Sequence, residues 1–158
     1  MRQLARRTLL IRSRVLTNCL HWRVVAGYLE TNVQAGELTE LQINHNFPAP
    51  KANTHVCMAF QLRQEGDIER DEESWLLPPL LIKIQPENSL PVVVPIHSGE
   101  EGKWVQLKLT VSRIRTPFKL LFQQSGPTPA SNEPALFSPF PVSMRMALAE
   151  MRISNGSC

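Results

Sequence analysis

The chain has 158 residues, a length that fits a single domain with a core of its own. Its composition is that of an ordinary globular protein, with 42% hydrophobic and 20% charged residues and a formal net charge of +3. The longest apolar stretches are far shorter than the roughly 20 residues of a membrane-spanning helix, so no transmembrane helix is expected. Thirteen prolines against seven glycines favour strands and loops over long helices.

The chain opens with a strongly basic segment. Residues 1–29 contain six arginines and no acidic residue, and the remainder is slightly acidic. We prefer an atypical start, from an alternative exon or an internal methionine, to a mitochondrial presequence, which has a similar composition. The uninterrupted apolar run of a signal peptide is absent. The segment also lacks interleaved aromatic residues and a basic domain behind it, so we expect no nucleic-acid partner.

Strand-like segments bounded by turn residues recur along the rest of the chain. We predict strands at residues 22–29, 37–43, 55–62, 76–84, 90–96, 104–111, 118–122 and 144–153. A turn is expected around 32–36, a loop at 44–53 and a long surface loop at 123–141. Pro91 and Pro95 restrict their strand to the edge of a sheet. Short strands in this number are typical of an all-β, antiparallel β-sandwich.

Three cysteines are an odd number, which leaves one pair and a leftover, or a partner outside this chain. Cys57 and Cys158 lie at the two edges of the strand-rich block, and this placement indicates a disulfide across a sandwich. In the chain-entropy model, closing a loop of about 100 residues stabilises a fold by about 4–5 kcal/mol. Cys19 is then the leftover, and the pairing favours an extracellular module.

No set of residues indicates catalysis. The four histidines have no cysteine or histidine at a metal-ligand spacing, and neither Ser-Gly pair has the context of a nucleophile elbow. Six acidic residues between positions 65 and 73 lack the spacing of a calcium-binding EF-hand loop, so a solvated loop is the preferred interpretation. We therefore expect no enzyme activity, no cofactor and no metal.

Three further residues or motifs have candidate roles. Asn155 begins an N-glycosylation sequon, Asn-Gly-Ser. Trp75, beside the acidic run, is the aromatic residue that we expect to be exposed at an interface. Trp104 and Phe60 are expected to be core anchors.

Several short blocks occur together in a characteristic order. They are GYLET at 27–31, AGELTEL at 35–41, HVCMAF at 55–60, LIKI at 81–84, GKWVQLKL at 102–109, FKLLF at 118–122 and ALAEM at 147–151, followed by Cys158. This series resembles the MAM domain, an extracellular module of meprins, neuropilin-type proteins and receptor tyrosine phosphatases. The resemblance covers about residues 27–158 and implies a jelly-roll sandwich, with residues 1–26 outside it.

The chain departs from the family pattern in two places. The early cysteine pair and the acidic-tryptophan segment are missing, so the opening strands look replaced by the Arg-rich segment. Ala149 and Glu150 stand where the family has two aspartates, which puts any cation site there in doubt.

The resemblance implies protein–protein recognition by an adhesion module of a larger cell-surface or secreted protein. Its partners would be other proteins, including a second copy, and it would reach a membrane only through the parent's anchor. One alternative is an intracellular or mitochondrial β-sandwich binding protein with reduced cysteines. Another is an isoform without a function of its own, because missing strands would expose a sheet edge.

Overall fold

The fold is described from a computed structural model. It covers residues 7–8, 16–17, 22–51, 55–67, 75–129, 142–156 and 158. Among these residues every regular element is a strand, and no helix has the length and apolar character needed to cross a membrane.

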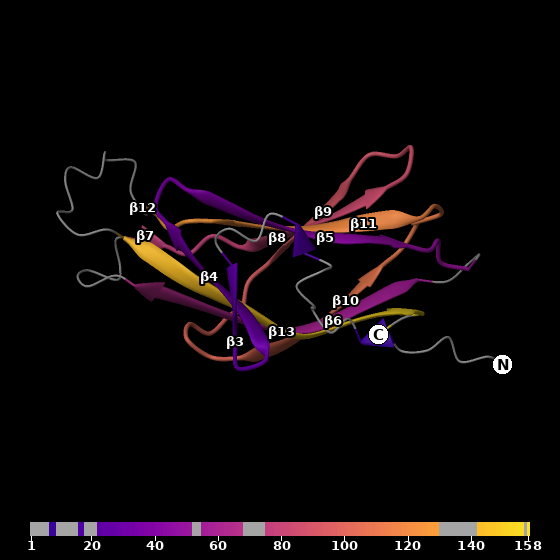
Figure 1. Cartoon of the computed structure of the whole chain (residues 1–158). Coiled ribbons are helices and arrows are strands. Elements are labelled where there is room, and N and C mark those ends of the chain that lie inside the picture. The colour runs from indigo at the N-terminus through magenta and orange to yellow at the C-terminus, as the bar shows by residue number, and fades with distance from the viewer. Residues whose placement is uncertain are drawn as a thin grey trace.

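Two antiparallel sheets lie face to face (Figure 1). Sheet A, the lower layer in Figure 1, has the order β10 (Val105–Val111), β6 (Val56–Asp67), β13 (Ser143–Asn155), β4 (Tyr28–Gln34) and β3 (Trp22–Val25), and β1 (Arg7–Thr8) also pairs with β13. Sheet B has the order β2 (Leu16–Thr17), β5 (Leu38–Phe47), β11 (Phe118–Ser125), β8 (Leu80–Pro86) and β9 (Val92–Ile96). A short ribbon of β7 (Trp75–Leu76) and β12 (Thr128–Pro129) lies at one end. The predicted all-β, antiparallel sandwich of jelly-roll type is confirmed.

The core lies between the sheets and follows the period-2 pattern of the strands. In β6 the even-numbered residues from 56 to 64 are buried, and the odd-numbered ones are only partly so. The same alternation places Phe118, Leu120 and Phe122 of β11 against this layer. Each fully buried apolar side chain of this size contributes about 1.5–3 kcal/mol. Phe60 is buried among them, as expected.

The predicted strand at 22–29 is wrong in one respect, because the segment folds as a hairpin. Val25 pairs with Tyr28, which leaves a two-residue turn at Ala26 and Gly27. Both turn residues have positive φ, 45° and 88°, the geometry that suits the twist of a hairpin. Because alanine rarely adopts positive φ, the sequence pattern gave no signal for this turn.

The first hairpin is part of the sandwich. β3 pairs with β4, and Trp22 belongs to the core cluster. The proposed boundary after residue 26 stays a prediction, and Cys19 lies outside the described residues.

Several strands extend further than predicted, among them β11, which runs to Ser125 and so into the surface loop expected at 123–141, because it pairs with β5 and β8 there. β5 continues to Phe47, into the expected loop, because its end pairs with the start of β11. β6 continues to Asp67 because β13 pairs with its full length. The edge position expected for the proline-containing strand is confirmed, since β9 ends sheet B and, among the described strands, pairs with β8 alone.

A bulge in β13 keeps its buried residues directed inward. Ala149 pairs with Gln61 of β6 and Arg152 pairs with Ala59, so two residues of β13 stand opposite one of β6. Glu150, at the bulge, has a φ of 50°. The extra residue lets Met151 enter the core after the bulge.

A buried polar network connects the two sheets. The side-chain amide of Gln64 in β6 donates to the side-chain oxygen of Gln124 in β11 at 2.9 Å and accepts from the backbone N–H of Ser98 at 3.1 Å. Gln124 in turn donates to the carbonyl of Pro78 at 3.1 Å. Because buried amides are costly without partners, these bonds fix where the loops around Pro78 and Ser98 meet the sandwich.

The structure joins Cys57 and Cys158 in a disulfide, the pairing expected from the sequence, with their Cα atoms 5.0 Å apart. The bond attaches the C-terminal residue to the start of β6. The backbone N–H of Cys158 also donates to the side-chain oxygen of Thr110 in β10, at 3.2 Å. Two strands of sheet A therefore hold the end of the chain.

The first prediction concerns this disulfide. Replacing both Cys57 and Cys158 by serine should lower the free energy of unfolding by about 2–5 kcal/mol, because the unfolded chain is no longer closed into a long loop. Urea unfolding followed by circular dichroism measures the change. When the parent is unfolded in the presence of a reductant, its free energy of unfolding should approach that of the double variant. Equal stability of the oxidised parent and the variant would contradict the prediction.

The second prediction concerns Gly126, which packs against the turn between β4 and β5. A Cβ atom at this position would lie 1.9 Å from the carbonyl oxygen of Gln34. Gly126→Ala should therefore destabilise the fold by about 1–3 kcal/mol through overpacking against backbone. The neighbouring substitution Ser125→Ala is the control and should change stability by less than about 0.5 kcal/mol.

Candidate functional site

The outer face of sheet A is the candidate site. In β6 the residues that alternate with the core, from Cys57 to Glu65, point away from sheet B. Strand pairing places residues of β10, β13 and β4 beside them on the same side, because directly opposed residues share a face. Across one such row, Arg63 is paired with Ala147 of β13, which is paired with Glu30 of β4.

Three large side chains meet on this face and form what we call the aromatic–arginine cluster: Tyr28, Arg63 and Trp104. The ring centroids of Tyr28 and Trp104 are 5.3 Å apart in an edge-to-face arrangement. The guanidinium carbon of Arg63 lies over both rings, 5.4 Å from the centroid of Tyr28 and 4.9 Å from that of Trp104. These distances are within the range of cation–π attraction.

The cluster reaches across the sheet because β13, the strand between β6 and β4, carries short side chains there. β6 and β13 lie between β4, which carries Tyr28, and β10, which Trp104 directly precedes, so β4 and β10 are about 14 Å apart at ordinary strand spacing. Ala147 and Ala149 are the outward residues of β13 along this path. Ala147 is only 1% exposed although it lies on an outer face. The short alanines therefore leave room for larger side chains to lean across them.

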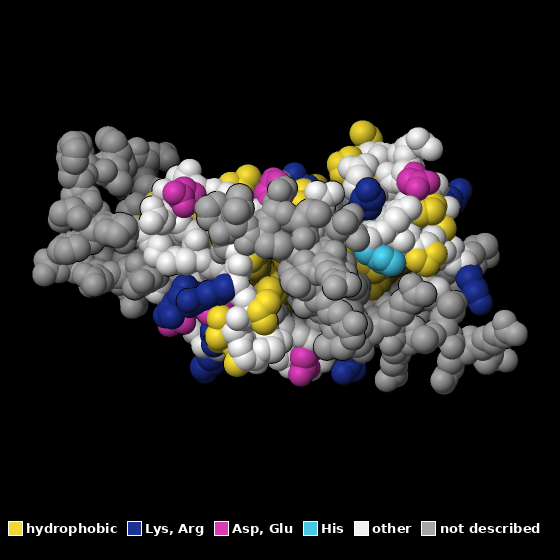
Figure 2. Space-filling view, in the orientation of Figure 1, with side chains coloured by type: hydrophobic (Ala, Val, Ile, Leu, Met, Phe, Trp, Pro, Cys, Tyr) yellow, Lys and Arg dark blue, Asp and Glu magenta, His cyan; other side chains and the backbone are white. Residues whose placement is uncertain are grey.

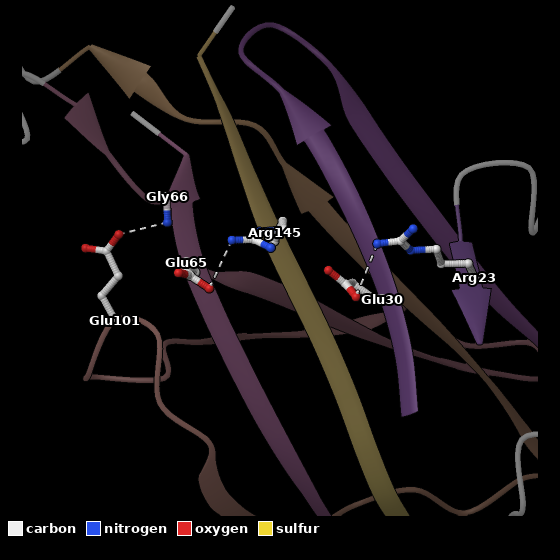
Figure 3. Close-up of polar contacts among 6 residues, drawn as sticks. All are labelled: Arg23, Glu30, Glu65, Gly66, Glu101 and Arg145. Atoms are coloured by element: carbon white, nitrogen blue, oxygen red, sulfur yellow. Dashed lines mark hydrogen bonds and ion pairs between the residues drawn. The ribbon is translucent and has the colours of Figure 1, made fainter. Parts of the chain in front are cut away.

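Two ion pairs lie on the same sheet as the cluster (Figure 3). Glu30 pairs with Arg23 of β3, their closest atoms being 3.7 Å apart, and Glu65 pairs with Arg145 of β13 at 3.5 Å. Both pairs lie across neighbouring strands of sheet A. Among the described residues, Arg63 has no carboxylate within ion-pair distance.

A hydrogen bond at the rim positions the loop that carries Trp104. The side chain of Glu101 accepts a hydrogen bond from the backbone N–H of Gly66 at 2.8 Å (Figure 3). The backbone N–H of Gly102 donates to the carbonyl of Gln64 at 2.9 Å. These two hydrogen bonds attach residues 101–102 to the end of β6 and so fix the backbone next to Trp104.

The expected core position of Trp104 is wrong, since this residue is 37% exposed. It has the same parity as Gln106, Lys108 and Thr110, the exposed residues of β10. That alternation was visible in the sequence and was the available signal. Tyr28 and Arg63 were not identified as site residues, because nothing local in the sequence brings β4 and β6 together.

The other predicted site residues lie elsewhere. Trp75 belongs to β7 and pairs with Pro129, and the orientation of its side chain is outside the described part of the structure. Asn155 is exposed at the end of β13. Cys57 is half-buried on the outer face of sheet A. None of these residues belongs to the aromatic–arginine cluster.

The described residues contain no group of three histidine, cysteine, aspartate or glutamate side chains that could hold a metal ion. Most of the acidic run, residues 68–74, lies outside the described ranges. The prediction of a solvated acidic loop is therefore untested.

Comparisons with known proteins do not assign a family. No family model and no curated protein matches the sequence. Among solved structures, a carbohydrate-binding module of family 29 aligns with a TM-score of 0.47 at 14% identity, over 90% of this chain and 75% of its own. A xylan-binding domain, CBM22-1 from Paenibacillus barcinonensis Xyn10C, aligns with a TM-score of 0.36 at 14% identity, over 87% of this chain and 86% of its own.

The third prediction tests the cluster as a physical unit. In a double-mutant cycle, Trp104→Ala and Arg63→Ala should be coupled by about 0.5–1 kcal/mol of unfolding free energy, because the guanidinium loses its ring partner. Urea unfolding of the four proteins measures the coupling. The control cycle combines Trp104→Ala with Lys119→Ala, an exposed cation of sheet B, and should show no coupling beyond about 0.3 kcal/mol. Equal coupling in both cycles would contradict the contact.

Proposed function

We propose that this chain is a non-catalytic, extracellular recognition module of the MAM type, which binds other proteins through the outer face of sheet A. The observation that carries the proposal is the aromatic–arginine cluster of Tyr28, Arg63 and Trp104. The cluster lies on the side of the sheet that faces away from the core. Its large side chains are therefore not needed to fill the interior.

The chemistry of the cluster supports recognition of a protein. Tyrosine, tryptophan and arginine are the residues that most often dominate the energy of protein–protein interfaces. Here they contact one another in the unbound chain, so binding would immobilise little additional side-chain freedom. Such pre-organisation increases affinity without requiring additional contacts.

The size and polarity of the face also suit an interface. Four of its strands, β10, β6, β13 and β4, at about 4.8 Å spacing and over about seven residues of each, make a face of roughly 450 Å² in projection. One partner in a standard interface buries about 800 Å² of accessible surface, so an interface of that size would also take in the adjoining loops. The ion pairs around the cluster would form the polar rim that such interfaces have.

The disulfide supports the extracellular assignment. Bonds of this kind form and persist mainly in oxidising compartments, and Cys57–Cys158 attaches the end of the chain to the sheet that carries the cluster. The exposed Asn155 is accessible for the proposed glycan. In the intracellular alternative, both cysteines would be reduced.

The fourth prediction tests the proposed binding face. The chain, secreted from mammalian cells and coupled to beads, is tested for bead aggregation and for binding to a panel of cell-surface ectodomains. Trp104→Ala should weaken any specific interaction by about tenfold or more, because a pre-organised anchor is lost. Leu90→Ala is the matched control, since Leu90 is an 87% exposed apolar residue near β9 of sheet B, and should bind as the parent does.

Two results would count against the proposal. If Leu90→Ala and Trp104→Ala had equal effects, the outer face of sheet A would not be the binding site. If mass spectrometry of the chain from mammalian cells showed all three cysteines reduced, the extracellular assignment would be rejected in favour of the intracellular alternative.

A further inference from the structure

We infer that Arg63 is the receptor for an acidic side chain of the protein partner. This inference rests on the proposed function and adds the chemistry of the ligand. It names one residue of this chain and one class of group, an aspartate or glutamate carboxylate, on the partner.

The first support is that Arg63 forms no ion pair with any acidic residue that the structure describes. The two carboxylates in adjacent positions on the face are occupied, since Glu30 pairs with Arg23 and Glu65 pairs with Arg145. The cross-strand neighbour of Arg63 on β13 is Ala147, which has no polar group to offer. Within the described part of the chain, the guanidinium therefore contacts aromatic rings but no carboxylate.

The second support is the way in which the guanidinium is held. Tyr28 and Trp104 contact it through their ring faces, while its N–H donors lie in its own plane. Because the two rings are inclined at 73° to each other, the guanidinium plane can be parallel to no more than one of them, and part of its N–H edge is directed at the other. A carboxylate can accept two parallel hydrogen bonds from the edge of such a group, which is the strong bidentate arrangement. The rings thus hold Arg63 in place, and because a guanidinium has five N–H donors, those that do not face a ring are left for a carboxylate.

The third support is the charge around the cluster. Lys108 of β10 and Arg152 of β13 flank Ala59 in one row of the same face, two outward positions along β6 from Arg63, and both are exposed. Neither forms an ion pair with another described residue. Glu150, the outward acid nearby, is engaged with the side-chain amide of Gln61 at 3.3 Å. Glu150 keeps its negative charge, but Arg63, Lys108 and Arg152 outnumber it, so this part of the face is net basic and would steer an acidic partner.

The space-filling view is consistent with this distribution. Along the lower side of the molecule, where sheet A lies in Figure 1, Lys and Arg side chains stand beside hydrophobic side chains and a few acidic ones (Figure 2). A partner that presents a carboxylate next to apolar groups would match both features. A protein segment offers this combination more readily than a neutral sugar, for which Arg63 occupies the ring surface that stacking would need.

The test uses the disulfide-bonded chain and a yeast-displayed random dodecapeptide library. Peptides that bind the tetramerised parent chain are sorted, sequenced and compared with the unsorted library. Aspartate and glutamate should be enriched. In each enriched peptide, replacing the critical acid by its amide should weaken binding by about tenfold or more, as expected for loss of a charge-assisted hydrogen bond.

Variants of the chain identify the residue responsible. Arg63→Gln should weaken binding as much as removal of the peptide carboxylate does, and the two changes together should be no worse than either alone. Arg63→Lys keeps the charge but loses the planar fork, so it should bind more weakly than the parent. Lys119→Gln removes an exposed cation from the outer face of sheet B and should have no effect.

The outcomes separate this inference from the proposed function. Suppose that the enriched peptides require Trp104 but show no excess of acidic residues and still bind Arg63→Gln. This result would overturn the inference but would still support the outer face of sheet A as the binding site. Peptides that tolerate both Trp104→Ala and Arg63→Gln would overturn both. Failure to enrich any peptide would overturn the inference, and so would binding to sialylated glycans alone, which would assign the site to carbohydrate.

Discussion

The register of β13 against β6 is the constraint on which the rest of the structure depends. β13 lies in the middle of sheet A, between β6 and β4, and pairs along nearly its whole length. Because side chains alternate between the faces of a strand, a slip of one residue would exchange the buried and exposed sets. Leu62 would then leave the core, and Arg63 would enter it. The observed register decides both what the sandwich buries and what it presents.

The bulge at Glu150 is part of this constraint. Before the bulge, the even-numbered residues of β13 point into the core. The extra residue reverses this alternation and directs Met151 into the core. Before the bulge, β13 presents Ala147 and Ala149 to the outer face. β13 therefore contributes large residues to the core and two small ones, Ala147 and Ala149, to the outer face. The aromatic–arginine cluster depends on these small residues.

Stability and recognition are separated in this arrangement. The core, the Gln64–Gln124 network and the packing around Gly126 lie between or at the end of the sheets, whereas the cluster lies on the opposite side of sheet A. Substitutions in the cluster can therefore alter binding with little effect on folding. The disulfide connects the two properties, because it fixes the C-terminal residue to β6, the strand that also carries Arg63. An oxidising compartment favours the disulfide-bonded state, in which the C-terminal residue is attached to sheet A.

The sequence by itself determined the all-β sandwich, the edge position of β9 and the pairing of Cys57 with Cys158. These features follow from local alternation, from prolines that cannot donate to a sheet, and from the placement of cysteines around a strand-rich block. Only the tertiary structure decided that Tyr28 meets Arg63 and Trp104, that 22–34 folds as a hairpin, and that β13 carries a bulge. The physical reason is that these features depend on which strands become neighbours. Neighbours are selected by packing across the whole sandwich, and no local pattern records that choice.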